Sequence, residues 1–367
     1  MTESTALVEI SRMGELSELM DLFTPIVADT EQHSNFRTIV KQNNPYNADV
    51  LNGWASGFHD RDGKFIKEFQ STFDSSFWEL YLFAVLKHFG MQVDFSVPSP
   101  DFLVTTNGGM NIEATVALHA QGAPPEYAAR KADQIPKDLN ELNRQTILRI
   151  RNSIDTKHKK YLKNYASLDH VANRPFVLAI TAFDSPYARL ACQRAIEAVL
   201  YGYYVDEEKF LREGGELERE RIATARKNNL SEVPLAVFAM QEFAWLSAVL
   251  FSSCASWGKV RALCSDPNPN IFFEAVKLNT AGVVPHVVRA RKSEYSESLL
   301  DGLRVYHNPS ATHKLDVNAL RHPDVFQSYF SEGENEWMHD QRDGLLLFRS
   351  VWTSIPRQKN RLPSEQG

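Results

Sequence analysis

The stretch PDFLVTTNGGMNIEATVAL, residues 100–118, most constrains the fold because it predicts two neighbouring strands joined by a tight turn. Two apolar runs flank the loop 107–109, which contains two glycines, and this pattern is typical of a β-hairpin. With a three-residue loop and a glycine in the left-handed conformation, Asp101 faces Thr115. Opposed residues, and residues two apart on one strand, share a face of the sheet. We therefore expect Asp101, Glu113 and Thr115 on one face.

A two-residue loop would give a different arrangement. Asp101 would then lie opposite Ala114 and point away from Glu113. We favour the three-residue loop, because it brings the carboxylates of Asp101 and Glu113 together, where they can share a cation. Converging carboxylates repel each other, and a divalent cation is the usual remedy. Mg²⁺ binds oxygen ligands, uses one or two carboxylates and keeps several waters, so Asp101, Glu113 and the carbonyl of Ala114 fit its demands.

Structural explanations for these acids stay open at this point. Asp101 follows a proline and could mark the entry of a strand. Glu113 lies inside an apolar strand, where a carboxylate costs free energy unless it is paired, hydrogen-bonded or bound to a metal. The sequence alone does not choose among these partners.

A buried helix is predicted before the hairpin, over residues 74–90. Ser76 is a candidate N-cap, Gly90 a C-terminal stop, and the segment is apolar on nearly every side. Ser76 and Glu79 have the spacing of a capping box, in which the glutamate side chain bonds back to the N-cap amide. Glu79 therefore has a structural explanation beside any role in a site.

Helices and strands alternate along the rest of the chain. After the hairpin we predict a helix over 139–165, a strand over 174–183, a helix over 187–204, and strands over 246–256 and 259–265. This order favours an α/β protein with a mixed central β-sheet flanked by helices. We predict these regions: 1–72, helical and loop segments packed on the core; 73–265, the α/β core with a charged insertion near 205–230; 266–367, a C-terminal extension.

Composition excludes several classes of protein. The chain is 43% hydrophobic and 23% charged, which is ordinary for a folded globular protein. Its N-terminus lacks a basic segment followed by an apolar run, so we expect a cytoplasmic protein without a membrane segment. The three cysteines are widely spaced and the sequence has no HExxH motif, so a zinc site has little support.

The predicted helix over 139–165 is strongly basic, although the chain has a net charge of −6. A solvated face is the ordinary explanation for such charge. Beside a two-carboxylate site, the same charges suit contact with phosphates. The candidate nucleic-acid contacts on this helix are Arg144, Arg149, Arg151, Lys157, Lys160 and Lys163.

The run from Glu79 through PD at 100–101 to IEAT at 112–115 resembles the catalytic core of the PD-(D/E)XK nucleases, the restriction-endonuclease-like superfamily. The resemblance covers residues 73–184 and implies a restriction-endonuclease-like core. Asp101 matches the family's metal-binding aspartate and Glu113 its second acid. Glu79 matches the glutamate that many members contribute from the preceding helix, where it binds metal or orients water.

One position departs from the family pattern. Thr115 stands where the family carries a lysine that positions or activates the attacking water. Some members supply this group from a neighbouring helix, and Lys157 and Lys160 are the candidates here. The catalytic set implied by the resemblance is Asp101, Glu113, Thr115, Glu79, Lys157 and Lys160.

The resemblance implies an endonuclease that hydrolyses phosphodiester bonds with Mg²⁺ or Mn²⁺. We expect DNA rather than RNA as substrate, because the superfamily mostly cuts DNA. Defence against foreign DNA is one biological role that such a nuclease can have. The alternative is a catalytically inactive nuclease-fold protein that acts as a nucleic-acid-binding or regulatory module. A glycoside hydrolase with paired acids ranks last, because the sequence shows no barrel repeat. A homodimer is left open.

Overall fold

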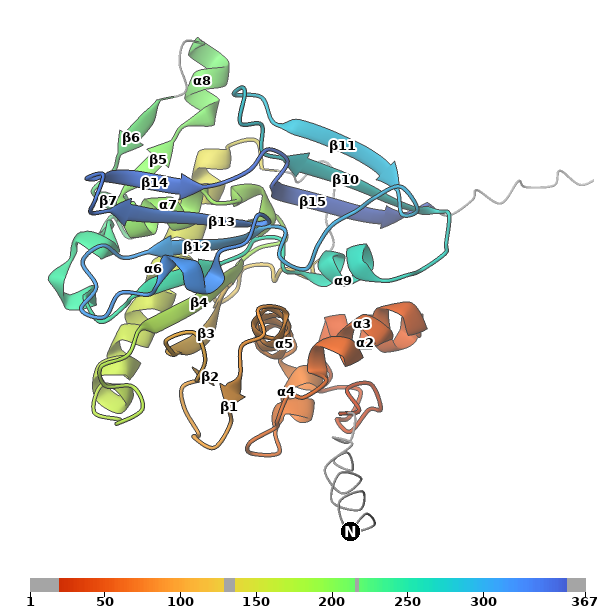
Figure 1. Cartoon of the computed structure of the whole chain (residues 1–367). Coiled ribbons are helices and arrows are strands. Elements are labelled where there is room, and N and C mark those ends of the chain that lie inside the picture. The colour runs from red at the N-terminus through yellow and green to blue at the C-terminus, as the bar shows by residue number, and fades with distance from the viewer. Residues whose placement is uncertain (1–19, 129–135, 215–217, 355–367) are drawn as a thin grey trace, which may run out of the picture.

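The computed structural model describes residues 20–128, 136–214 and 218–354, and an eight-stranded mixed sheet forms its centre (Figure 1). The strand order is β1-β2-β3-β4-β9-β12-β13-β14. Three neighbouring pairs are parallel: β3 with β4, β4 with β9, and β12 with β13. The prediction of a mixed sheet flanked by helices is confirmed. The strands of this sheet are β1 (Val93–Asp94), β2 (Phe102–Val104), β3 (Met110–Leu118), β4 (Phe176–Phe183), β9 (Ala248–Phe251), β12 (Leu303–His307), β13 (Val325–Ser331) and β14 (Glu336–Asp340).

Helices cover both faces of the sheet because its central strands are apolar on both sides. Every residue of β4 is buried. Val177 and Ala179 of β4 pack in one core with the N-terminal helices, whereas Leu178 and Ile180 pack in a second core with the later helices. The N-terminal helices are α2 (Ser34–Gln42), α3 (Pro45–Ala55), α4 (Phe65–Ser71) and α5 (Asp74–His88), red to brown in Figure 1. The helices on the other face are α6 (Leu139–Lys160), extended by a π-helical turn (Tyr161–Tyr165), and α7 (Arg194–Tyr201).

Helix α5 begins two residues earlier than the predicted cap at Ser76. The N-cap residue is Phe73, whose ring packs between those of Phe69 and Phe77, with centroids 5.2 and 5.5 Å away. Ser76 lies inside the helix, is buried, and its hydroxyl has no hydrogen-bond partner among the described residues. The predicted capping box is therefore wrong. Aromatic packing, rather than a side-chain cap, positions the start of α5.

The hairpin has the predicted strands but a longer loop. The observed register pairs Val104 with Met110 and Phe102 with Ile112, so five residues separate the strands. The three-residue loop was wrong: Thr105 and Thr106 pair with no residue of β3, and the backbone N–H of Thr105 donates to the carbonyl of Gln92 on the side of β1, 3.0 Å away. The slip is two residues, and a shift of two keeps every side chain on its predicted face.

The C-terminal part of the chain completes the central sheet. Strands β12, β13 and β14 follow residue 265, so the sheet extends across the boundary that we predicted there. A second, three-stranded sheet is antiparallel and consists of β10 (Ile271–Lys277), β11 (His286–Arg291) and β15 (Leu346–Thr353), at the upper right of Figure 1. The strand predicted over 259–265 is wrong, because these residues form most of helix α9 (Trp257–Leu263).

The charged segment near 205–230 folds into small elements of its own. They are β5 (Tyr203–Val205), α8 (Glu207–Glu213), β6 (Arg219–Arg221), β7 (Thr224–Arg226) and β8 (Glu232–Pro234). Strands β5 and β6 form one hairpin, and β7 and β8 form another. Ala225 and Val233 of the second hairpin join the core beneath α6 and α7. The insertion is therefore attached to the core rather than fully detached from it.

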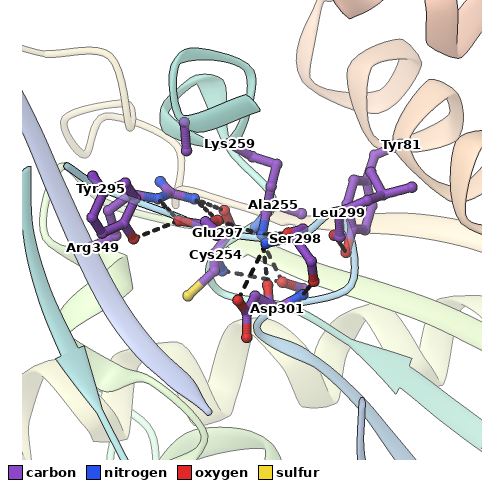
Figure 2. Close-up of polar contacts among 12 residues, drawn as sticks. Tyr81, Cys254, Ala255, Lys259, Tyr295, Glu297, Ser298, Leu299, Asp301 and Arg349 are labelled. Atoms are coloured by element: carbon purple, nitrogen blue, oxygen red, sulfur yellow. Dashed lines mark hydrogen bonds and ion pairs between the residues drawn. The ribbon is translucent and has the colours of Figure 1, made fainter. Parts of the chain in front are cut away.

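A buried ionic cluster joins the second sheet to the central one, and Figure 2 shows Glu297 at its centre. The Glu297 carboxylate accepts hydrogen bonds from Arg349 Nε at 2.8 Å and from the Tyr295 hydroxyl at 2.7 Å, and it forms an ion pair with Lys259. Burial alone would raise the pKa of Glu297, but the charges of Arg349 and Lys259 outweigh burial and lower it to about 2. The Glu297 carboxylate is therefore ionised in the folded protein at neutral pH.

The remaining donors of this cluster bond to backbone carbonyls. The Lys259 amine donates to Ser298 at 2.9 Å and to Asp301 at 2.7 Å, and Arg349 Nη2 donates to Cys254 at 2.7 Å. A buried ion pair contributes stability only when its charges are paired and hydrogen-bonded. This cluster meets that condition and links α9, the segment before β12, and β15.

Replacing Glu297 with glutamine should be strongly destabilising, because two buried cations would lose their carboxylate. We expect E297Q to lower the free energy of unfolding by about 3–5 kcal/mol, measured by urea denaturation. The matched control is E220Q, which removes the exposed ion pair with Lys209 and should leave the unfolding curve near that of the wild type. Equal effects of the two substitutions would contradict this assignment.

Candidate functional site

Glu113 is a buried carboxylate on β3 that three side chains from α6 and its π-helical turn surround. Its Oε1 atom accepts hydrogen bonds from the amines of Lys157 at 2.6 Å and Lys160 at 2.7 Å, and its Oε2 atom accepts one from the Tyr165 hydroxyl at 3.0 Å. The Glu113 side chain is 1% exposed, whereas those of Lys157 and Lys160 are 18% and 41% exposed. The two amines therefore lie between a buried anion and the surface.

These contacts determine the charge states around Glu113. Burial alone would raise the pKa of Glu113, but the charges of Lys157 and Lys160 outweigh it and lower the pKa. Burial would lower the pKa of the Lys160 amine, but the charge of Glu113 outweighs it and raises this pKa. Burial and the charge of Glu113 raise the pKa of Tyr165, whose hydroxyl stays protonated and donates. Glu113 is thus ionised at neutral pH.

Asp101 immediately precedes β2, beside Glu113. Continuing the observed pairing of Phe102 with Ile112 by one residue sets Asp101 opposite Glu113, on the same face of the sheet. Its Oδ2 atom accepts a hydrogen bond from the backbone N–H of Ala114 at 2.6 Å. Burial, and next the charge of Glu113, raise the pKa of Asp101 to about 6. The two acids are close enough for each charge to affect the other.

Glu79 approaches the same acids from α5, on the other side of the sheet. Burial raises its pKa to about 8, and the charge of Asp101 is the next largest cause, while the charge of Arg61 opposes the rise. No described residue donates a hydrogen bond to the Glu79 carboxylate. The cations among the described residues do not fully offset the burial of Glu79 and Asp101, so the pKa values of both acids stay raised.

Some carboxylate lone pairs of Asp101 and Glu113 accept no hydrogen bond from the described residues, and such oxygen atoms suit a hard cation. Each carboxylate oxygen offers about two lone pairs. Both on Glu113 Oε1 are used by lysines, but one remains on Oε2, and Asp101 Oδ1 accepts no hydrogen bond from the described residues. Within the described ranges, no group of three or more His, Cys, Asp or Glu side chains is placed to hold a metal. The set fits Mg²⁺, which needs only one or two carboxylates and completes its shell with water.

The structure also places Thr115 and the residues that sequence reasoning missed. Thr115 lies two residues after Glu113 and shares its face of β3, and the amines come from α6 instead. Tyr165 lies about 140° from Lys160 around an ideal α-helix, so its contact depends on the π-helical turn, which the sequence did not signal. Arg61, which the sequence analysis did not single out, donates to the carbonyls of Val97 and Pro100 beside Asp101, at 2.8 and 3.1 Å.

The other basic residues of α6 differ in what they offer a phosphate. Arg151 is buried, ion-pairs with Asp155 and lies over the ring of Phe243. Its charge is therefore not available at the surface of this structure, unlike what the prediction of a nucleic-acid contact requires. Its apolar neighbours in the core explain why a residue on a basic helix is buried there.

Arg144, Arg149 and Lys163 lie nearer the surface. Arg144 pairs with Glu141 at 2.7 Å and also donates to a carbonyl of the insertion, at Arg226. Arg149 is partly buried, and Lys163 is exposed in the π-helical turn. The structure thus brings Lys157 and Lys160 together at Glu113. Lys163 does not contact Glu113, and its side chain is exposed.

Comparisons with protein-family models, curated proteins and solved structures found no match to this chain. None of the helices in the described ranges combines the length and the apolar character that crossing a membrane requires. Function is therefore inferred from the chemistry of the site.

The raised pKa values of Glu79 and Asp101 predict how stability changes with pH. The ordinary pKa values are 4.5 and 3.8, and the folded values are about 8 and about 6. At a pH between its ordinary and its folded pKa, each of these acids binds more protons in the folded protein than in the unfolded chain. The free energy of unfolding therefore falls as pH rises through this range. In E79Q this position cannot ionise, and we expect a smaller loss between about pH 5 and about pH 9.

Urea denaturation in EDTA at both pH values measures this effect. The control is E334Q, at an exposed glutamate in the β13–β14 turn, which should follow the wild type. If the wild type and E79Q lose the same free energy between the two pH values, Glu79 does not have a raised pKa.

Proposed function

We propose that this protein is a Mg²⁺-dependent endonuclease of the PD-(D/E)XK type that hydrolyses phosphodiester bonds, with DNA as the preferred substrate. The observation that carries the proposal is the pair of lysine amines from α6 on the carboxylate of Glu113, beside Asp101. These amines stand in the neighbourhood where the family's lysine would act, although Thr115 occupies its sequence position. The order α5, β2, β3, α6, β4 also agrees with the proposed core.

Each residue has a role that follows from its surroundings. Asp101 and Glu113, with the carbonyl of Ala114, would hold the cation. A bound Mg²⁺ would polarise a phosphoryl oxygen and lower the pKa of the attacking water. Lys157 and Lys160 carry positive charge where negative charge develops on the phosphate, and Glu79 orients water from the side of α5. The side chains of Lys157 and Lys160 are partly exposed, so a phosphate at the surface can reach their amines.

One observation favours a second candidate, a nuclease-fold protein that binds nucleic acid without cutting it. Lys157 and Lys160 neutralise Glu113 without a metal and fill both lone pairs of its Oε1 atom. A site of this kind can hold a phosphate by charge alone. The two candidates therefore differ in whether Asp101 binds a cation.

Cleavage of plasmid and single-stranded DNA, and of RNA, with Mg²⁺, Mn²⁺ or EDTA tests the enzyme directly. D101N should abolish cleavage, because the variant keeps an acceptor for the Ala114 N–H but loses its charge. K157M and K160M should each slow cleavage by about 100-fold. The control is K159M, at an exposed lysine of the same helix, which should cleave at the wild-type rate. Cleavage by D101N, or in EDTA, would contradict the proposed mechanism.

Thermal unfolding with and without Mg²⁺ separates the two candidates. A cation that binds only the folded state stabilises it, by about 2.7 kcal/mol at a concentration 100 times Kd. We expect wild-type protein to gain stability with Mg²⁺ and D101N to gain much less. Ca²⁺ serves as a non-catalytic control for divalent binding. Nucleic-acid binding with no metal-dependent shift and no cleavage would instead support the non-catalytic candidate.

A further inference from the structure

A cavity of about 380 Å³ lies at the carboxyl ends of the parallel strands β4 and β9, away from the site at Glu113. Phe183, the last residue of β4, lines it, whereas Glu113 pairs with Leu178, roughly 17 Å earlier along that strand. Ligands of open α/β sheets bind preferentially in the crevice outside the carboxyl ends of the strands. The volume is typical of a site for a small molecule. The cavity is also lined by Asn35 of α2, Asp74 and Phe77 of α5, Tyr127, and Ser256 and Trp257 at the start of α9.

Asp74 is a buried carboxylate in this cavity that no cation of the described residues neutralises. It is 8% exposed, and the hydrogen bond that it accepts from Asn35 Nδ2 is long, at 3.5 Å. Burial raises its pKa to about 7, and the charge of Glu126 is the next largest cause. No lysine, arginine or histidine of the described residues pairs with Asp74 or shifts its pKa. Because buried charges are normally paired, a cation from outside the chain would supply the missing partner.

The other charged groups around the cavity do not supply that partner. Arg189 forms an ion pair with Glu126, so its charge is already offset there. His33 packs against the rings of Phe73 and Tyr127, and burial is the main cause that lowers its pKa to about 4. It is therefore uncharged at neutral pH.

Aromatic rings form much of the cavity wall. Tyr127 is 42% exposed, and Trp257 lies beside Phe77, with ring centroids 6.5 Å apart. Phe73 and Phe183 also line the cavity. The faces of such rings attract cations, and a cage of aromatic rings is the usual site for a quaternary ammonium group. A carboxylate among aromatic rings therefore favours an organic ammonium ion over a metal ion.

Ser256 adds a polar group that lacks a partner. It is 4% exposed, and its hydroxyl has no hydrogen-bond partner among the described residues. Buried hydroxyls are normally hydrogen-bonded. A ligand with a hydroxyl group beside its cationic head would satisfy Ser256 as well as Asp74.

We propose that this cavity binds a small quaternary ammonium compound, with its cationic head near Asp74, Tyr127 and Trp257 and a hydroxyl group near Ser256. The ligand is a free small molecule of the size of choline. The proposal does not depend on the proposed nuclease activity, because none of these residues belongs to the site at Glu113.

Isothermal titration of the full chain with choline tests the proposal, at about pH 8, where Asp74 with its pKa of about 7 is mostly ionised. The neutral isostere 3,3-dimethylbutan-1-ol has the same shape without the charge, and it should bind at least about tenfold more weakly. Sodium chloride at the concentration of choline should not displace choline, because a hydrated sodium ion gains little from the rings. The nuclease-site variant D101N should bind choline as the wild type does.

Two variants locate the binding. D74N keeps an acceptor for Asn35 but removes the charge, and Y127A removes an exposed ring; each should weaken choline binding by about tenfold or more. The matched controls are D49N and Y46A, at exposed residues of α3 outside the cavity, and both should bind normally.

Circular dichroism shows whether each variant folds, and Y127A decides if D74N does not, because Tyr127 is exposed. Three results would each overturn the proposal: no binding of choline to the wild type, equal binding of choline and its neutral isostere, or choline binding that folded D74N and Y127A leave unchanged.

Discussion

The burial of β4 on both faces is the constraint on which the rest of the structure depends. A strand that is apolar on both sides needs a layer of helices against each face. Helix α5 therefore packs on one side and α6 on the other, and the neighbouring strand β3 lies between them. Glu79 from α5 and the lysines from α6 consequently approach the acids of β2 and β3 from opposite sides.

Two buried glutamates show how this protein accommodates charge in its interior. Glu297 is bound by Lys259 and Arg349, and Glu113 is bound by Lys157 and Lys160. Both carboxylates have lowered pKa values because paired cations outweigh burial. The difference lies in the surroundings. The side chains of the Glu297 cluster are buried, whereas Lys157 and Lys160 are partly exposed, so of these two clusters only the one at Glu113 is open to solvent.

Local sequence patterns predicted the elements well where one interaction dominates. The hairpin, the long basic helix and the buried strand β4 all appear where their patterns place them. Predictions failed where tertiary contacts compete with local signals. The hairpin loop is two residues longer than its pattern indicates, and the ring of Phe73 replaces the cap expected at Ser76. The helix at 257–263 was read as a strand because short apolar segments are ambiguous.

The sequence placed Asp101 and Glu113 on one face once the longer loop was chosen over the two-residue loop. Strand periodicity depends only on parity, so this placement survives a two-residue change of register. The sequence also determined that a basic helix follows them. Only the tertiary structure decided which of its cations reach the acids. Lys157 and Lys160 bind Glu113, whereas Arg151 is buried elsewhere, and a π-helical turn brings in Tyr165. The physical reason is that helical spacing defines faces within one helix, but its rotation against the sheet depends on the packing of the whole core.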